Sequence, residues 1–241
     1  MATRLSCLGD SITRAQVSVD YLDLLSRRHE PGELRLSRFG VNGDFAYNLL
    51  QRLDQVFATP SNVITVLIGT NDARASLAGY PMGRAMKRKQ LPRRPDGAWF
   101  QDCLVAVVER LRAETDATVG LLSLPVLGQD LTAPGAKASE AYSRMIAEVA
   151  AAHGLAYLPL RERQVEEIRR TGAAPIPYRE ARHPAFNSTV FQRFVLRRSL
   201  DAISRSRDLL LTTDFVHQNS RGAALIAEVI DGSGLLTGSA R

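Results

Sequence analysis

The sequence predicts an α/β fold in which helices cover both faces of a parallel β-sheet. Short apolar runs rich in β-branched residues alternate along the chain with longer amphipathic stretches. This alternation is typical of β-α-β units with right-handed crossovers. The chain has 241 residues, of which 45% are hydrophobic and 23% charged, so it can bury one sizeable core. No internal repeat or interdomain linker is visible, and we expect a single domain over residues 1–241.

Five short apolar runs are the expected strands. In chain order they are Leu5–Leu8, Leu34–Arg38, Val63–Ile68, Val119–Leu124 and Ala156–Leu158. Longer stretches with apolar residues at helical spacing predict helices between and after these strands. They are Gln16–His29, Ala46–Phe57, Trp99–Thr115, Ser139–His153, Arg161–Thr171 and Ser220–Ile230. Two further segments, 76–97 and 172–210, are irregular, and we expect the second to be an irregular or helical insertion.

This insertion contains one stretch that predicts helix. Residues 187–206 read "NSTVFQRFVLRRSLDAISRS", without Gly or Pro. At about 100° per residue, the apolar side chains fall on two nearly opposite sides. One side gathers Val190, Phe191, Phe194 and Val195, and the other gathers Leu196, Leu200 and Ile203. The pattern predicts either two short core helices with a break near Val195, or a cap whose Phe191 and Phe194 bind the acyl part of a substrate.

Composition argues against a membrane span, secretion and a metal site. No run approaches about 18 apolar residues, and the N-terminus enters the first strand without the apolar core of a signal peptide. We therefore expect a cytoplasmic protein with no membrane span. Cys7 and Cys103 fit small buried hydrophobes in a reducing compartment. No His pair has metal-ligand spacing, so we expect neither a metal nor another cofactor.

The net charge of +6 raises the question of an anionic partner. Six basic residues lie in "RAMKRKQLPRRP", from Arg84 to Pro95. This run has no interleaved aromatic residues and no recognisable nucleic-acid module around it, so we expect no nucleic-acid binding. The pattern is typical of a solvated loop, and attraction of an anionic substrate or surface is the alternative interpretation.

Polar residues cluster in the loops that follow the first three expected strands. Gly9-Asp10-Ser11 follows the first strand, "GVNGD" (40–44) the second, and Gly69-Thr70-Asn71-Asp72 the third. Asp214 and His217 stand three residues apart just before the last expected helix. Because functional groups of parallel sheets collect at the carboxyl ends of the strands, we expect all these residues at one rim.

These residue types are the ones that acyl transfer needs. Ser11, at a strand-to-helix turn, exposes a hydroxyl that His217 can deprotonate, while Asp214 accepts from the other imidazole nitrogen. An oxyanion hole can form from the backbone N–H groups of Ser11 and Gly43 and the side-chain amide of Asn71. Each has a simpler explanation: a helix N-cap for Ser11, a turn glycine for Gly43 and an Asx turn for Asn71.

The blocks "GDS", "GVNGD", "GTND" and "DFVH" occur in this order, and together they resemble the SGNH hydrolases, also called the GDSL esterase/lipase family. The resemblance extends from residue 5 to about residue 230 and implies a flavodoxin-like three-layer α/β/α sandwich with a five-stranded parallel sheet. It also implies Ser11 as nucleophile in a triad with Asp214 and His217, and an oxyanion hole formed by Ser11, Gly43 and Asn71. The chain departs from the family at Gln218, where proline is frequent, and in the long segment before Asp214.

Other titratable residues have structural explanations. His29 and His153 end expected helices, where a cationic side chain favours the helix dipole. His183, three residues after an acid, is the rival base, although it lies away from the expected strand ends. We expect Asp10 and Asp72 to organise the loops through hydrogen bonds.

The sequence therefore predicts a serine esterase or acylhydrolase that cleaves a small-molecule carboxylic ester of a small or medium acyl group through an acyl-enzyme intermediate. One alternative is a noncatalytic flavodoxin-like binding module for a phosphate or nucleotide, which the acidic Asp10 disfavours. The other is a carbohydrate O-deacetylase or thioesterase with the same triad, because the triad acts on the acyl carbon and the pocket selects the rest. The motifs leave the physiological substrate and the oligomeric state open.

Overall fold

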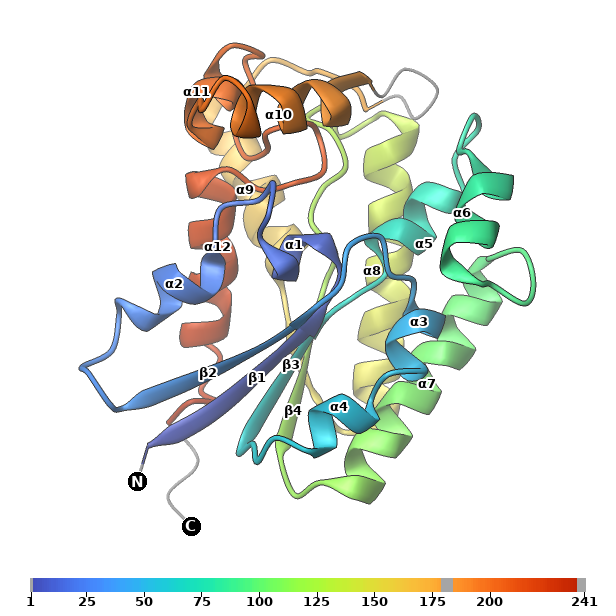
Figure 1. The fold of residues 1–241 in the computed structure, drawn as a ribbon, viewed down its shortest axis with the longest axis vertical. Helices are drawn as coiled ribbons and strands as arrows, with labels where there is room; N and C mark the ends of the chain where they lie inside the picture. Colours follow the sequence, from blue (N-terminus) through green and yellow to red (C-terminus); the bar gives the residue numbers. More distant parts are fainter. Residues whose placement is uncertain (1, 179–183, 238–241) are drawn as a thin grey trace.

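The centre of the molecule is a five-stranded parallel sheet with the strand order β2-β1-β3-β4-β5 (Figure 1). The structure is a computed structural model that describes residues 2–178 and 184–237. Neighbouring strands are parallel throughout. This order is that of a flavodoxin-like doubly wound sheet, so the predicted fold class is confirmed. The strands are β1 (Thr3–Gly9), β2 (Leu34–Gly40), β3 (Val63–Leu67), β4 (Thr118–Leu122) and β5 (Ala156–Leu158).

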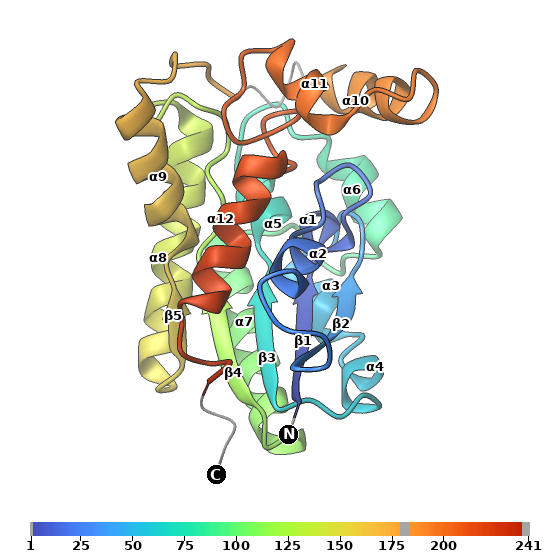
Figure 2. The ribbon, with the colours of Figure 1, turned by 90° about the vertical axis from the view of Figure 1, so that its left-hand side faces the viewer.

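Helices cover both faces of this sheet (Figures 1 and 2). Strand residues alternate between two cores: Leu8 and Ile64 lie in one, Cys7 and Val63 in the other. The alternation follows from the two-residue period of a strand, and burial on both faces makes the strands continuous apolar runs. The first core packs against α3 (Ala46–Leu50), α7 (Gly97–Glu114) and α8 (Pro134–Ala152), the second against α2 (Tyr21–Ser26), α9 (Leu160–Thr171) and α12 (Ser220–Asp231).

One expected helix is shortened in the structure and another is divided. Of the helix expected over Gln16–His29 only α2 forms, and a separate short helix that was not predicted, α1 (Ser11–Arg14), precedes this range. Ala15 ends α1 in a left-handed conformation with φ 59°, and Asp20 starts α2 by accepting from backbone N–H groups of its first turn. The helix expected over 46–57 is divided by a turn at 51–53 into α3 and α4 (Asp54–Phe57).

The other expected helices are present with shifted ends. α7, α9 and α12 begin close to the predicted residues, whereas α8 begins earlier, at Pro134, a residue suited to the first turn of a helix. Besides α1, two short helices in the described residues were not predicted. They are α5 (Thr70–Ala75), directly after β3, and α6 (Met82–Lys89), inside the segment expected to be irregular.

The described residues of segment 172–210 form two helices beyond the carboxyl edge of the sheet (Figures 1 and 2). α10 (Pro184–Phe194) and α11 (Leu200–Arg205) are separated by a break in which Arg197 adopts a φ of 53°. The predicted break between two short helices is therefore confirmed. Leu200 is buried, so α11 packs into the core.

The structure bears on two predictions from composition, one about membrane-spanning helices and one about the two cysteines. No helix in the described part of the chain is long and apolar enough to cross a membrane. Cys7 and Cys103 are buried free thiols, as predicted. Burial raises the pKa of Cys7 to about 11 and that of Cys103 to about 12, so neither is a reactive thiolate near neutral pH.

Candidate active site

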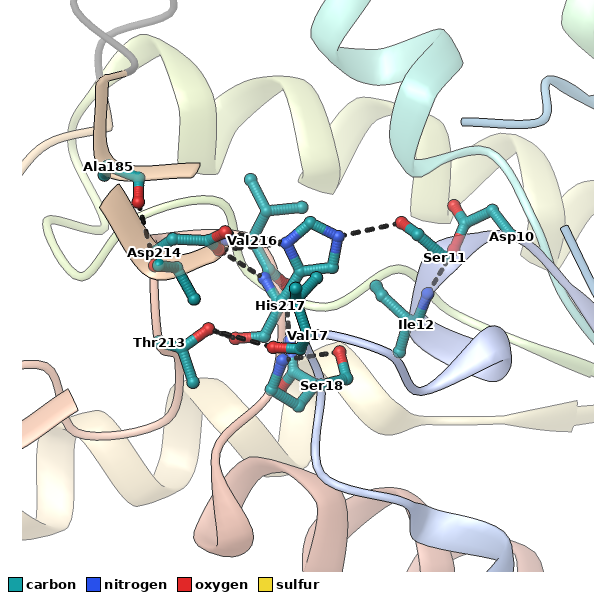
Figure 3. A network of polar contacts seen from close by, with 12 residues as sticks. Asp10, Ser11, Ile12, Val17, Ser18, Ala185, Thr213, Asp214, Val216 and His217 are labelled. Carbon is teal, nitrogen blue, oxygen red and sulfur yellow. Dashed lines mark hydrogen bonds and ion pairs between the residues drawn. The ribbon is translucent and has the colours of Figure 1, made fainter. Parts of the chain in front are cut away.

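Three side chains from distant parts of the chain meet near the carboxyl end of β1 (Figure 3). Ser11 is the first residue of α1, and Asp214 and His217 lie in the loop before α12. His217 Nε2 lies 2.9 Å from Ser11 Oγ, and His217 Nδ1 lies 2.8 Å from Asp214 Oδ2. Because a carboxylate only accepts hydrogen bonds, Nδ1 carries the proton and Nε2 is left to accept from the serine hydroxyl. The structure thus joins the three residues that the sequence suggested for acyl transfer.

Ser11 does not cap the helix that it begins. The N-cap is Asp10, whose Oδ1 accepts from the Ile12 N–H at 2.9 Å. The Ser11 side chain is left to contact His217, so the N-cap explanation of this serine is wrong. The turn from a buried strand into a short helix holds the hydroxyl at the rim of the sheet.

The loop before α12 is folded around the Asp214 carboxylate. Its Oδ1 accepts from the N–H groups of Val216 at 3.2 Å and His217 at 2.8 Å, and Phe215 takes a φ of 73° within this turn. Asp214 and His217 are both buried. A buried carboxylate with two backbone donors and an imidazole donor has a fixed orientation, and it therefore fixes the imidazole as well.

Asn71 and Gly43 lie in loops that adjoin the Asp10–Ser11 turn. Asn71 Nδ2 donates to the Asp44 carbonyl at 3.0 Å and lies 3.3 Å from Asp10 Oδ2. Gly43 has a φ of 72°, which L side chains rarely adopt. Asn71 therefore connects the loop after β1 with the loop after β2. The residues suggested for an oxyanion hole come from three neighbouring loops.

Charged side chains fix the loop that contains Gly43. The Asp44 carboxylate binds Arg52 Nε at 2.7 Å and Lys89 Nζ at 2.8 Å. Arg52 also donates to backbone carbonyls at the ends of β1 and β2, at 2.9 and 3.0 Å. All three charged side chains are largely buried, so loss of the Asp44 carboxylate would leave two buried cations without their acidic partner. Sequence reasoning missed this network because its members lie far apart along the chain.

Asp10 and Asp72 are buried carboxyls at the same edge of the sheet. Asp72 Oδ2 accepts from the Ala46 N–H at 3.2 Å, which ties α5 to α3. Burial raises the pKa of Asp10 to about 6, opposed by the Ile12 N–H, and raises the pKa of Asp72 to about 7, opposed by the Ala46 N–H. Both carboxyls accept hydrogen bonds from loop backbone, as predicted.

The aromatic ring beside the histidine belongs to Phe186, on α10. Its centroid lies 5.5 Å from that of His217, and the residue is 36% exposed. Phe191 and Phe194, which the sequence suggested for substrate binding, are 53% and 59% exposed. At about 100° per residue, Phe191 points about 140° away from Phe186, and Phe194 lies about two turns further along the helix. α10 therefore presents Phe186, and not Phe191 or Phe194, to His217.

Two of the remaining histidines lie outside this group. His29 Nε2 pairs with Asp231 Oδ1 at 3.0 Å, and His153 is the C-cap residue of α8. The rival base His183 lies outside the described residues. Across the described ranges, no group of three His, Cys, Asp or Glu side chains could hold a metal ion. The side chains that do lie together are suited to proton transfer between a hydroxyl and an imidazole.

Several solved structures share this fold. A catalytic mutant of Axe2, an acetylxylan esterase from Geobacillus stearothermophilus, matches with a TM-score of 0.66 and 16% identity over 95% of this chain and 94% of that one. The acetyl xylan esterase AlAXEase matches with a TM-score of 0.62 and 18% identity over 94% and 97% of the two chains. LAE5, an alpha/beta hydrolase from the metagenome of Lake Arreo in Spain, matches with a TM-score of 0.64 and 20% identity over 98% of both chains. At these identities the likeness shows the fold.

Comparison of the sequence, in contrast to comparison of the fold, identifies the family of this chain. Comparison with curated protein sequences gives no match. The sequence model of the GDSL-like lipase/acylhydrolase family, however, matches residues 7–225, a span that contains the loops of Ser11, Asn71 and His217. The chain therefore belongs to the GDSL-like lipase/acylhydrolase family and is a carboxylic ester hydrolase.

Proposed function

We propose that this chain hydrolyses carboxylic esters of small or medium acyl groups through an acyl-enzyme intermediate on Ser11. His217 acts as the general base, and Asp214 orients the imidazole and stabilises its protonated form. The observation that supports this proposal is the His217 ring, which contacts the Ser11 hydroxyl with one nitrogen and the Asp214 carboxylate with the other. A noncatalytic binding module has no need of this arrangement.

In the first half of the reaction, His217 Nε2 takes the proton of Ser11 as Oγ attacks the ester carbonyl carbon. The carbonyl oxygen becomes an oxyanion. His217 then gives the proton to the alcohol oxygen, the bond between this oxygen and the acyl carbon breaks, and the alcohol leaves. In the second half, His217 takes a proton from water, which attacks the acyl group. The carboxylic acid is released and Ser11 is protonated again.

The oxyanion is stabilised by the backbone N–H groups of Ser11 and Gly43 and by the Asn71 amide. Of the two contacts that Asn71 Nδ2 makes, the one to Asp10 Oδ2 is longer, at 3.3 Å, than the one to the Asp44 carbonyl, at 3.0 Å. The weaker contact leaves this N–H able to turn toward an oxyanion, while the stronger one keeps the amide in place.

Replacement of the nucleophile tests the proposal. The wild-type chain should react with a fluorophosphonate probe at Ser11 and hydrolyse p-nitrophenyl esters in a panel from acetate to decanoate. Ser11→Ala should lose the labelling and lower kcat by about 10⁴ or more, because the covalent route is removed. Ser26→Ala, an exposed serine on α2, is the matched control and should keep both. If Ser11→Ala kept more than about a tenth of the activity, the proposed mechanism would be wrong.

Acetylated carbohydrate is a second candidate substrate class with the same chemistry. Two of the structural neighbours are acetylxylan esterases by name. The partly exposed ring of Phe186 beside His217 also supports it, because the alcohol half of the ester leaves on the histidine side, where an aromatic ring can pack against a sugar. Acetate release from acetylated xylo-oligosaccharides, measured beside the p-nitrophenyl esters and an acyl-CoA, separates deacetylation from simple ester and thioester hydrolysis.

A further inference from the structure

The loop that contains Gly43 is flanked by a guanidinium from α6. Arg88 lies in the last turn of this helix and is exposed. A Cβ atom placed on Gly43 would lie 3.0 Å from Arg88 Nη2 and 3.8 Å from Arg88 Cζ, so the guanidinium lies directly against this glycine. Phe45 and Ala85 belong to one small apolar cluster, which packs α6 against the same loop. The position of Arg88 is therefore set by the fold.

Arg88 differs from its charged neighbours in having no acidic partner. Lys89 and Arg52 both bind the Asp44 carboxylate. Among residues 2–178 and 184–237, no carboxylate forms an ion pair with Arg88 and no group accepts a hydrogen bond from it. Two cations share the single charge of Asp44, and Arg88 adds a further unpaired charge. The rim beside Gly43 is therefore positive, and a guanidinium there is available to a ligand.

We infer that the site prefers esters whose acyl half carries an anionic group, such as the half-esters of a short dicarboxylic acid. This inference rests on the proposed function. In that mechanism the alcohol oxygen leaves on the side of His217, and the carbonyl oxygen is held by the loop of Gly43. Arg88 lies against this loop, so it is the acyl half that can bring a carboxylate within reach of the guanidinium. A carboxylate matches the planar donors of an arginine.

The charge of the whole chain favours the same class of substrate. A net charge of +6 attracts anions, and the segment from Arg84 to Pro95, which contains Arg88, carries six of the basic residues. The sequence alone favoured a solvated loop for this segment. The structure instead forms helix α6 and places two of the segment's six basic side chains, Arg88 and Lys89, against Gly43; of these two, Lys89 already binds Asp44.

The test compares matched esters in wild type and variants. Mono-p-nitrophenyl succinate and p-nitrophenyl butyrate differ in a charge on the acyl half, whereas 4-carboxyphenyl acetate and phenyl acetate differ in a charge on the alcohol half. Wild type should give a higher kcat/KM for the succinate than for the butyrate, with a preference that weakens as NaCl is raised from about 0.05 to about 0.5 M. Arg88→Gln should lower the succinate-to-butyrate ratio about three- to tenfold, and Arg88→Lys should lower it less.

Lys87→Gln is the matched control, because it removes the same charge from another face of α6 and should keep the wild-type ratio. An unchanged ratio in Arg88→Gln, or an equal loss for both acyl esters, would overturn the inference. If a charge changed kcat/KM only between 4-carboxyphenyl acetate and phenyl acetate, Arg88 would act on the alcohol half of the ester, and its assignment to the acyl half would be wrong. Failure of the proposed function gives a different result: wild type would hydrolyse none of the four esters, and Ser11 would not be labelled.

Discussion

At the scale of single residues, Gln218 shows how buried side chains hold the candidate base in place. Its Oε1 accepts from Gln164 Nε2 at 2.8 Å, and its own Nε2 donates to the Val216 carbonyl at 2.9 Å. Gln164 Oε1 in turn accepts from the Val126 N–H at 2.9 Å, and both glutamines are fully buried. The loop before α12 is thereby tied to α9 and to the segment after β4. A proline, which the resemblance makes frequent here, could supply neither side-chain bond.

Asn71 carries the clearest prediction at this scale. Asn71→Ala should lower kcat about 10²- to 10³-fold with little change in KM, because its hydrogen bond strengthens only as charge develops on the carbonyl oxygen. Steady-state kinetics with p-nitrophenyl acetate measure both constants. Asn62→Ala is the control, since Asn62 accepts from the Arg4 N–H at the amino end of the sheet. A rise in KM with kcat untouched would show that Asn71 only binds substrate.

At the scale of elements, the position of α10 depends on one arginine. Arg207 donates to Thr189 Oγ1 at 2.6 Å and to the Ala185 carbonyl at 3.3 Å, and also to the carbonyl of Thr213. Thr213 directly precedes Asp214, so the same guanidinium binds α10 and the loop that contains Asp214 and His217. Burial lowers the pKa of Arg207, and the Asp214 carboxylate opposes this effect. This bridge seats α10 with Phe186 against His217.

Because α10 is seated in this way, its aromatic residues should differ in their effect on selectivity. Phe186→Ala should change the kcat/KM ratio of phenyl acetate over ethyl acetate by about 1–3 kcal/mol, since an apolar wall beside the alcohol half of the ester is lost. Phe194→Ala, a phenylalanine on the same helix that is 59% exposed, should leave the ratio nearly unchanged. A changed kcat/KM ratio of hexanoate over acetate in Phe194→Ala, with no effect of Phe186→Ala on either ratio, would restore the expectation from the sequence, in which Phe191 and Phe194 line the acyl site.

The strands and the loops after them could be predicted from the sequence, whereas some helix ends and the orientation of α10 could not. The strands could be predicted because burial on both sheet faces leaves continuous apolar runs, and the loops after β1 and β3 could be identified from their polar residues. The end of α1 depends on the left-handed Ala15, a conformation that an alanine in the sequence does not indicate, and the helix expected over 16–29 therefore starts only at α2. Helical periodicity shows which residues of α10 share a face. Which face meets His217 is decided by Arg207, a tertiary contact.

At the scale of the whole molecule, sheet order assembles the site. β1 lies between β2 and β3, so the loops after these three strands are neighbours at one edge of the sheet. The loop before α12, which contains Asp214 and His217, reaches the same edge. Residues separated by most of the chain, Ser11 and His217, meet for this reason. The arrangement also brings carboxyls together: Asp10 and Asp72 are both buried at this edge, and burial raises the pKa of each.

These two carboxyls predict how the stability of the whole chain depends on pH. Burial raises the pKa of Asp72 from 3.8 to about 7, so between these values the folded chain binds more protons than the unfolded chain. The contribution to stability is fully present below about pH 4 and is lost as pH rises through about 7. Asp10, with a pKa of about 6, acts in the same direction.

Asp72→Asn isolates this effect, because an asparagine oxygen can still accept from the Ala46 N–H while the side chain stays neutral. Relative to wild type, the variant should gain unfolding free energy between pH 4 and pH 8, on the order of 3–4 kcal/mol, since each pKa unit corresponds to about 1.4 kcal/mol. Urea unfolding at several pH values measures the difference. Asp102→Asn, at an exposed position on α7, is the control and should show almost no such trend. If the difference between Asp72→Asn and wild type stayed constant across this range, Asp72 would already be ionised in the folded chain at pH 4, and its burial would have to be offset by charges not recognised among its contacts.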